Sequence, residues 1–329
     1  MKLALALLLQ VVMRSSASAH GSPIDDLTAS GAWTDDLGVI IPLYVAALLY
    51  LLGTWRLWRR AGHGRGIRYR QAGSFWSGWT VLALALLSPL HWLSEHLFAA
   101  HMVEHELMML VAAPLLVLSR PIGAFLWALP QNWRRGLGGV AHLNWFSTCW
   151  HFLCRPTVAT LLHGVAIWGW HIPAAFTAAL DHITLHWLQH LSFLVTALLF
   201  WWSLFNGRER AAGYGAGVFW LFITAMHTSA LGIILTLSKT PWVPFQTDLS
   251  AGWGLTPLED QQLAGLIVWV PASVIYTAVA LIMAAKWVRA SGRSTTIGGA
   301  DARWPKALGY GDRGSGADRW VVRSDARSA

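Results

Sequence analysis

The sequence is poor in charged side chains, and this shortage decides the class of protein. Only 12% of its 329 residues are Asp, Glu, Lys or Arg, whereas 55% are hydrophobic. Soluble domains carry about 25% charged residues, and several apolar runs here reach the roughly 20 residues that cross the hydrocarbon core of a bilayer. The composition therefore argues against a soluble protein and predicts an all-α, polytopic membrane protein.

Cysteine and the common catalytic motifs are also scarce or missing. The two cysteines, Cys149 and Cys154, have a spacing that matches no common zinc motif, so we treat both as free thiols. The sequence has no phosphate-binding or dinucleotide-binding glycine motif and no nucleophile elbow. We therefore expect a binding protein rather than an enzyme. The net charge of +8 follows the pattern of a membrane orientation signal, so nucleic acid is not an expected partner.

Seven hydrophobic segments are predicted to span the membrane. Residues 1–19 precede these spans and have the pattern of a signal peptide. They contain a basic residue, Lys2, then a short apolar core, and they end on the small residues Ala17-Ser18-Ala19. A periplasmic segment over residues 20–37 and a seven-helix membrane domain over residues 38–290 would follow. The predicted spans cover residues 38–56, 74–92, 99–119, 155–172, 183–205, 216–237 and 262–287.

Positive charge alternates between the two sides of these spans. The first loop, residues 56–70, holds six arginines, whereas the loops of the opposite side contain a single basic residue, Lys239. Because Lys and Arg are retained on the cytoplasmic side, we expect the N-terminus outside and the C-terminus inside a bacterial inner membrane. The tail, residues 291–329, is rich in Gly, Arg and Asp and is predicted to be cytoplasmic and disordered.

Histidine is the one ligand-forming residue type that this chain has in number. With the orientation above, eight of the fourteen histidines gather at the outer membrane face. His101 and His105 share one helix face, because residues four apart lie on the same side of a helix. His182, His186 and His190 repeat this spacing at the start of the fifth span. Two such faces at matched depth predict a metal site of imidazole nitrogens, which bind copper, zinc and iron.

Other polar or soft side chains lie at the same membrane face. Met102 offers a thioether, which suits Cu(I), and Glu104 could orient an imidazole through a hydrogen bond. His171 ends the fourth span at this face. By contrast, His91 and His96 are interpreted as residues of a solvated outer loop.

Four motifs, in their order and spacing, resemble the CtaG family of bacterial cytochrome c oxidase assembly factors. They are "HMVEH" leading into "LMMLVAAPLLVLSRP", then "WGWHIP", then "DHITLHWLQHLSF", and finally "DQQLAGLIVW". The resemblance covers about residues 35–290. The sequence departs from the family pattern in two places. Glu104 and Glu106 stand where less acidic residues are common, and Ala113-Pro114 stands where a double proline is common.

The resemblance implies a role in maturing a caa-type heme–copper oxidase. Copper is then the expected metal, and oxidase subunits and a copper donor protein are the expected partners, within the lipid bilayer. Glu104 and Gln261 are expected to support the ligands from outside the coordination sphere. Matched motif by motif, the predicted metal-binding residues are His101, Met102, His105, His171, His182, His186, His190 and Asp260.

Three other functions fit part of this pattern. A heme-binding membrane cytochrome or heme carrier would use paired histidines as axial ligands, although such sites typically use one histidine per helix. A membrane metalloenzyme acting on lipids would need an open coordination position and a base, for which Glu104 or Glu106 could serve. A proton-coupled transporter would use His, Glu and Asp as a relay, but the histidines are clustered at one face and sparse through the membrane.

Overall fold

The computed structural model describes residues 33–141, 143–206, 213–242 and 247–298, and every regular element in them is a helix. The predicted signal peptide, His20 and the tail after residue 298 lie outside these residues. Five helical segments are long and apolar enough to cross a membrane, which confirms an all-α, multi-pass membrane protein. They are α2 (Leu37–Ala61), the continuous α5 (Phe98–Glu106), η2 (Leu107–Ala112) and α6 (Ala113–Ser119), then α12 (Ile183–Asn206), α13 (Gly213–Leu237) and α15 (Pro257–Gly298).

Two of the seven predicted spans are helical but shorter. Helix α3 (Tyr69–Leu87) has 19 residues and α10 (Pro156–Trp170) has 15. Helix α10 is about 22 Å long, less than the roughly 30 Å of a hydrocarbon core, and α3 is not among the candidate spans. The crossing of the membrane by these two segments stays a prediction. Helix α15 continues to Gly298, past the expected end of the last span at residue 287 and into the predicted tail.

Short helices connect these segments. They are α4 (Pro89–Ser94), α7 (Ile122–Ala128), α8 (Gln131–Ala141), α9 (Asn144–Leu153), α11 (Pro173–Asp181) and α14 (Thr247–Gly252). Helix α4 begins where Ser88 accepts a hydrogen bond from the Leu90 amide and Pro89 occupies the first turn, a favourable start for a helix. It joins α3 to α5 and therefore lies at the same end of the bundle as the first turns of α5.

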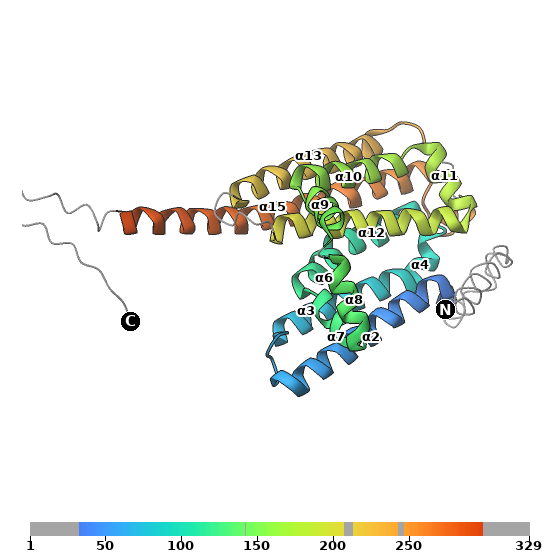
Figure 1. Cartoon of the computed structure of the whole chain (residues 1–329). Coiled ribbons are helices and arrows are strands. Elements are labelled where there is room, and N and C mark those ends of the chain that lie inside the picture. The colour runs from blue at the N-terminus through green and yellow to red at the C-terminus, as the bar shows by residue number, and fades with distance from the viewer. Residues whose placement is uncertain (1–32, 142, 207–212, 243–246, 299–329) are drawn as a thin grey trace, which may run out of the picture.

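The continuous segment α5–η2–α6 lies at the centre of the molecule. It packs against α15, α12 and α3, while α13 runs along α15, α10 along α12, and α2 against α7 (Figure 1). In its most apolar window 56% of the residues are buried, against 22–33% in the other four candidate spans. Polar side chains on α5 are therefore enclosed by protein rather than by lipid.

The centre of this segment is a widened helical turn, η2, in which hydrogen bonds run between residues five apart. The Ala113 amide bonds to the Met108 carbonyl in this way. Pro114 gives a physical reason, because proline lacks an amide proton and its ring clashes with the carbonyl four residues earlier in a regular helix. The indole of Trp201 on α12 donates a hydrogen bond of 2.9 Å to the Met109 carbonyl. The turn is thus held by a neighbouring helix, and such turns often occur at functional sites.

Asp36 fastens the start of α2 to the start of α12. One carboxylate oxygen accepts a 2.8 Å hydrogen bond from the Gly38 amide and caps α2. The other accepts a 2.7 Å hydrogen bond from the indole of Trp187 on α12. Because Trp187 lies between His186 and His190 in the sequence, this contact fixes the position of the two imidazole-bearing turns.

Candidate metal site

Helices α5 and α12 bring two pairs of histidines face to face. The ring centroids of His101 and His105 on α5 are 4.3 Å apart, and those of His186 and His190 on α12 are also 4.3 Å apart. Between the helices, His101 lies 5.7 Å from His186, and His105 lies 5.2 Å from His190. The four-residue spacing places each pair on one helix face, and the packing of the helices turns both faces toward each other.

Three of these imidazoles are close enough to share one metal ion. One ring nitrogen from each of His101, His186 and His190 lies within 4.8 Å of the other two. Small rotations of the rings would bring such atoms to the bonds of about 2.0–2.1 Å that imidazole makes to zinc. The three side chains are buried, with exposed fractions of 1%, 7% and 8%, so a bound ion would be shielded from bulk solvent.

Unpartnered nitrogens support this assignment. The Nε2 atoms of His186 and His190 and both ring nitrogens of His105 are buried without a hydrogen-bond partner among the described residues. A buried polar atom without a partner costs about 1–3 kcal/mol, and most such atoms in proteins are paired. A metal ion held by the triad would remove this penalty at His186 and His190, so the donor set fits an imidazole-bound transition metal. His105, a predicted ligand, lies beside His190 but is not one of the three converging residues.

Glu104 lies beside the triad, fully buried. Its Oε1 accepts a hydrogen bond of 2.9 Å from Nδ1 of His91 on α4 and lies 3.8 Å from Nδ1 of His190. A carboxylate bonded to an imidazole fixes the orientation of the ring. The negative charge also offsets the positive charge of a cation placed between the histidines, which matters because charges are expensive inside a membrane.

His91 was expected in a solvated loop, and that expectation is wrong. It is 8% exposed, bonds to Glu104, and stacks on His186 with ring centroids 5.8 Å apart. His91 lies on α4 and has no helical spacing to the histidines of α5 or α12, so its contact with them could not be predicted from spacing. Gln189 was also missed, although it lies three residues after His186, and both of its amide atoms are buried without a partner among the described residues.

His171 and Met102 form a neighbouring pair. Nδ1 of His171 donates to the Ile167 carbonyl at 2.7 Å, and its Nε2 lies 3.4 Å from the Met102 sulfur. Both side chains are buried, and Met102 is on α5 between the turns that carry the imidazoles. The structure thus brings the thioether of Met102 and the imidazole of His171 next to the triad without including them in it.

Three predicted residues lie elsewhere. Asp260 accepts hydrogen bonds from the amides of Phe98 and Ala99, at 2.7 and 2.9 Å, and so caps the start of α5. Gln261 bonds through its oxygen to the Trp242 amide, in the connection between α13 and α15. His182 is exposed at the end of α11. The contacts of Asp260 point to a role in positioning α5 rather than to a metal bond.

Glu106, which is half-buried, and His163, which is buried, lie apart from the triad. Oε2 of Glu106 has no hydrogen-bond partner among the described residues. Nδ1 of His163, on α10, is 3.0 Å from the hydroxyl of Thr196 on α12. This contact matches the expectation that a single histidine within the membrane is packed and hydrogen-bonded.

Comparison with known proteins identifies the family. No curated protein and no solved structure matches the chain. The model of one protein family, described as cytochrome c oxidase caa3 assembly factor, matches residues 48–290. This range contains α5, α12 and every histidine of the site. The match covers well over half of the sequence, and the chain therefore belongs to the cytochrome c oxidase caa3 assembly factor family.

Proposed function

We propose that this protein binds a copper ion through His101, His186 and His190 and passes it to a cytochrome c oxidase during assembly. The observation that carries the proposal is the convergence of three buried ring nitrogens within 4.8 Å of one another. Membership of the oxidase assembly family supplies the biological setting. We assign the site a binding role and no catalytic one.

The neighbourhood of the triad supports copper over heme. Copper in either oxidation state accepts imidazole, and the thioether of Met102 beside His171 suits Cu(I). A heme held by two histidines needs space for a porphyrin between them. The rings of His105 and His190, whose centroids are 5.2 Å apart on facing helices, leave no such space. A free metal ion fits these distances.

Release of the metal would be helped by the residues around the triad. His171 and Met102 lie on the α10 side of the site, while His91 and Glu104 lie on the α4 side. An ion could leave the triad by exchanging one imidazole for another donor at either side, without passing through an uncoordinated state. Such stepwise exchange suits a protein that hands on a metal rather than storing it.

We place the site at the periplasmic side of a bacterial inner membrane. It lies at the opposite end of α2–α3 from the arginine-rich residues 56–70, which Lys/Arg asymmetry assigns to the cytoplasm. In a Cys149→Ser/Cys154→Ser background, we expect Trp253→Cys to react with a membrane-impermeant thiol reagent in intact cells. His63→Cys should react only after the cells are opened.

Both added thiols replace exposed side chains, so the comparison does not depend on burial. The cysteine-free background should retain the metal content of the natural sequence, because neither cysteine belongs to the site. Labelling of residue 63 from outside intact cells would reverse the orientation.

Oxidase activity in cells tests the proposed function. In cells whose only copy carries His101→Ala, we expect the oxidase subunits to be made while oxidase activity falls about tenfold or more, because loss of even a supporting residue costs 10–100-fold in metal affinity. Added copper should restore part of the activity, since mass action can compensate for a weakened delivery step.

A matched control is His182→Ala, which removes an exposed histidine from the same region of the sequence and should leave activity unchanged. If activity fell in the His101→Ala strain while the purified variant kept its full copper content, the histidines would serve something other than copper delivery.

A further inference from the structure

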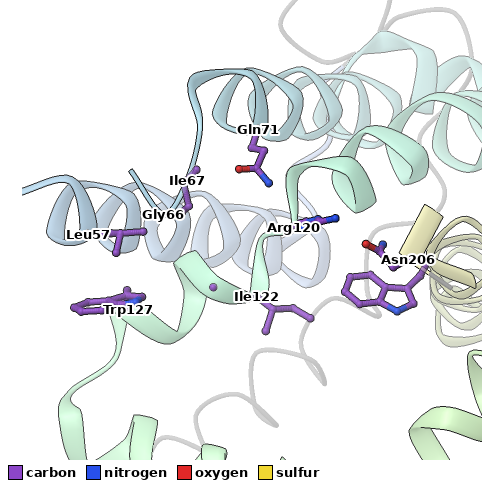
Figure 2. A pocket seen from close by; sticks show the side chains of 10 residues that line it. Leu57, Gly66, Ile67, Gln71, Arg120, Ile122, Trp127 and Asn206 are labelled. Carbon is purple, nitrogen blue, oxygen red and sulfur yellow. The ribbon is translucent and has the colours of Figure 1, made fainter. Parts of the chain in front are cut away.

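The arginine-rich end of the molecule contains a cavity that the metal site does not use. The cavity has a volume of about 620 Å³ and lies where the end of α2, the start of α3, the junction of α6 and α7, and the end of α12 meet (Figure 2). The lining residues come from three separate parts of the chain, residues 57–71, 120–127 and 202–206. The cavity is therefore formed by the tertiary fold rather than by a single loop.

The walls of this cavity combine two kinds of surface. Leu57, Ile67 and Ile122 are apolar, and the indoles of Trp127 and Trp202 add aromatic surface. Polar groups come from other directions, and these are the amides of Gln71 and Asn206 and the guanidinium of Arg120. In Figure 2 Arg120 extends from the end of α6 toward Asn206 on α12.

Among the residues that the structure describes, the charged side chains near the cavity are arginines. The guanidinium groups of Arg60 and Arg134 lie over the ring of Trp127, at 5.6 and 4.4 Å from its centroid. Residues 56–70 and 120–155 together contain ten arginines and no Asp or Glu. These two segments therefore contain no carboxylate that could neutralise Arg120.

Arg120 has an unusual backbone. It is the single non-glycine residue with positive φ in the described part of the chain, with φ 52° and ψ 56°, and it ends α6 just before Pro121. Glycine or asparagine is the usual residue in this left-handed conformation. Glycine or asparagine would adopt this conformation more easily, but neither would place a guanidinium group at the cavity.

We propose that this cavity binds the phosphate head group of an anionic glycerophospholipid. Guanidinium groups bind phosphate through paired hydrogen bonds, and the amides of Gln71 and Asn206 can donate to further oxygens. Basic pockets between transmembrane helices are known to take such head groups, and tryptophan favours the membrane interface. The apolar wall of Leu57, Ile67 and Ile122 would receive the first part of the acyl chains, which a free phosphate ion lacks.

Native mass spectrometry of the full-length protein in detergent tests this site, with phosphatidylglycerol and phosphatidylcholine as probes. The natural sequence should bind one phosphatidylglycerol at least fivefold more tightly than phosphatidylcholine. Arg120→Asn should abolish this preference, because asparagine accepts the left-handed backbone while the guanidinium is lost. Arg155→Gln, an exposed arginine of the same end that does not line the cavity, should bind as the natural sequence does.

Three results would overturn the proposal. They are equal binding of the two lipids, an unchanged preference in Arg120→Asn, and displacement of phosphatidylglycerol by millimolar inorganic phosphate, which would indicate an ion site. Asn206→Leu, on the opposite wall, is the second variant and should also weaken phosphatidylglycerol binding. The metal content of both variants should match that of the natural sequence, which separates a lost lipid site from a disturbed fold.

Discussion

Replacing His190 by alanine is expected to remove nearly all of the bound metal. The residue supplies one of three ring nitrogens in the triad and also lies 3.8 Å from Glu104. Supporting residues around a metal are worth 10–100-fold in affinity, so loss of a ligand should weaken binding by at least about 100-fold. His101→Ala should have the same effect, measured as metal content per chain by mass spectrometry after gel filtration.

The double variant distinguishes one site from two. Ligands of a shared site act as a unit, so His101→Ala/His190→Ala should lose little more than either single variant. His182→Ala is the control, because it continues the four-residue spacing of His186 and His190 but is exposed. Partial losses in the single variants that add up in the double variant would show two independent sites and contradict the shared triad.

Asp260→Ala is expected to destabilise the metal-free protein. Its carboxylate accepts two hydrogen bonds from the buried amides at the start of α5, and it is itself 2% exposed. Hydrogen bonds to a charged group contribute about 1.5–3 kcal/mol each, so the loss of both should lower the free energy of unfolding by about 3–6 kcal/mol. Thermal unfolding in detergent, after treatment with a chelator, measures it.

The chelated state is what separates the two possible roles of Asp260. A residue that positions α5 stabilises the protein with or without metal, whereas a metal ligand stabilises only the metal-bound form. Glu259→Gln is the neighbouring control, because Glu259 is exposed and bonds within its own turn to Thr256. Asp260 would be a metal ligand if the Asp260→Ala variant contained less metal than the natural sequence before chelation, yet unfolded at the same temperature after chelation.

The sequence was most informative where one physical signal dominated. Long apolar runs located α2, α12, α13 and α15 because hydropathy alone decides whether a helix can cross a bilayer. The four-residue spacing likewise indicated which faces of α5 and α12 carry imidazoles. Both are local properties of a helix, and they remain visible without any knowledge of how the helices pack.

Contacts between segments that are distant in the sequence could not be predicted from hydropathy or helical spacing. His91 and Glu104 are 13 residues apart and meet only because α4 folds back over α5. Asp260 was predicted as a ligand from the resemblance to the family motif, whereas its partners, 161 and 162 residues away, are backbone amides that no side-chain pattern reveals. The widened turn before Pro114 depends in part on Trp201 from another helix.

Metal analysis of the natural protein, purified from copper-supplied cells, combined with its absorption spectrum, tests the central claim most directly. We expect roughly one copper ion per chain, bound through imidazole nitrogens, and no heme absorption band. Copper should be lost together with the triad in His101→Ala. A protein that contains no copper when purified and takes up none when it is supplied, or that shows a heme spectrum, would contradict the assignment of these histidines as a copper site.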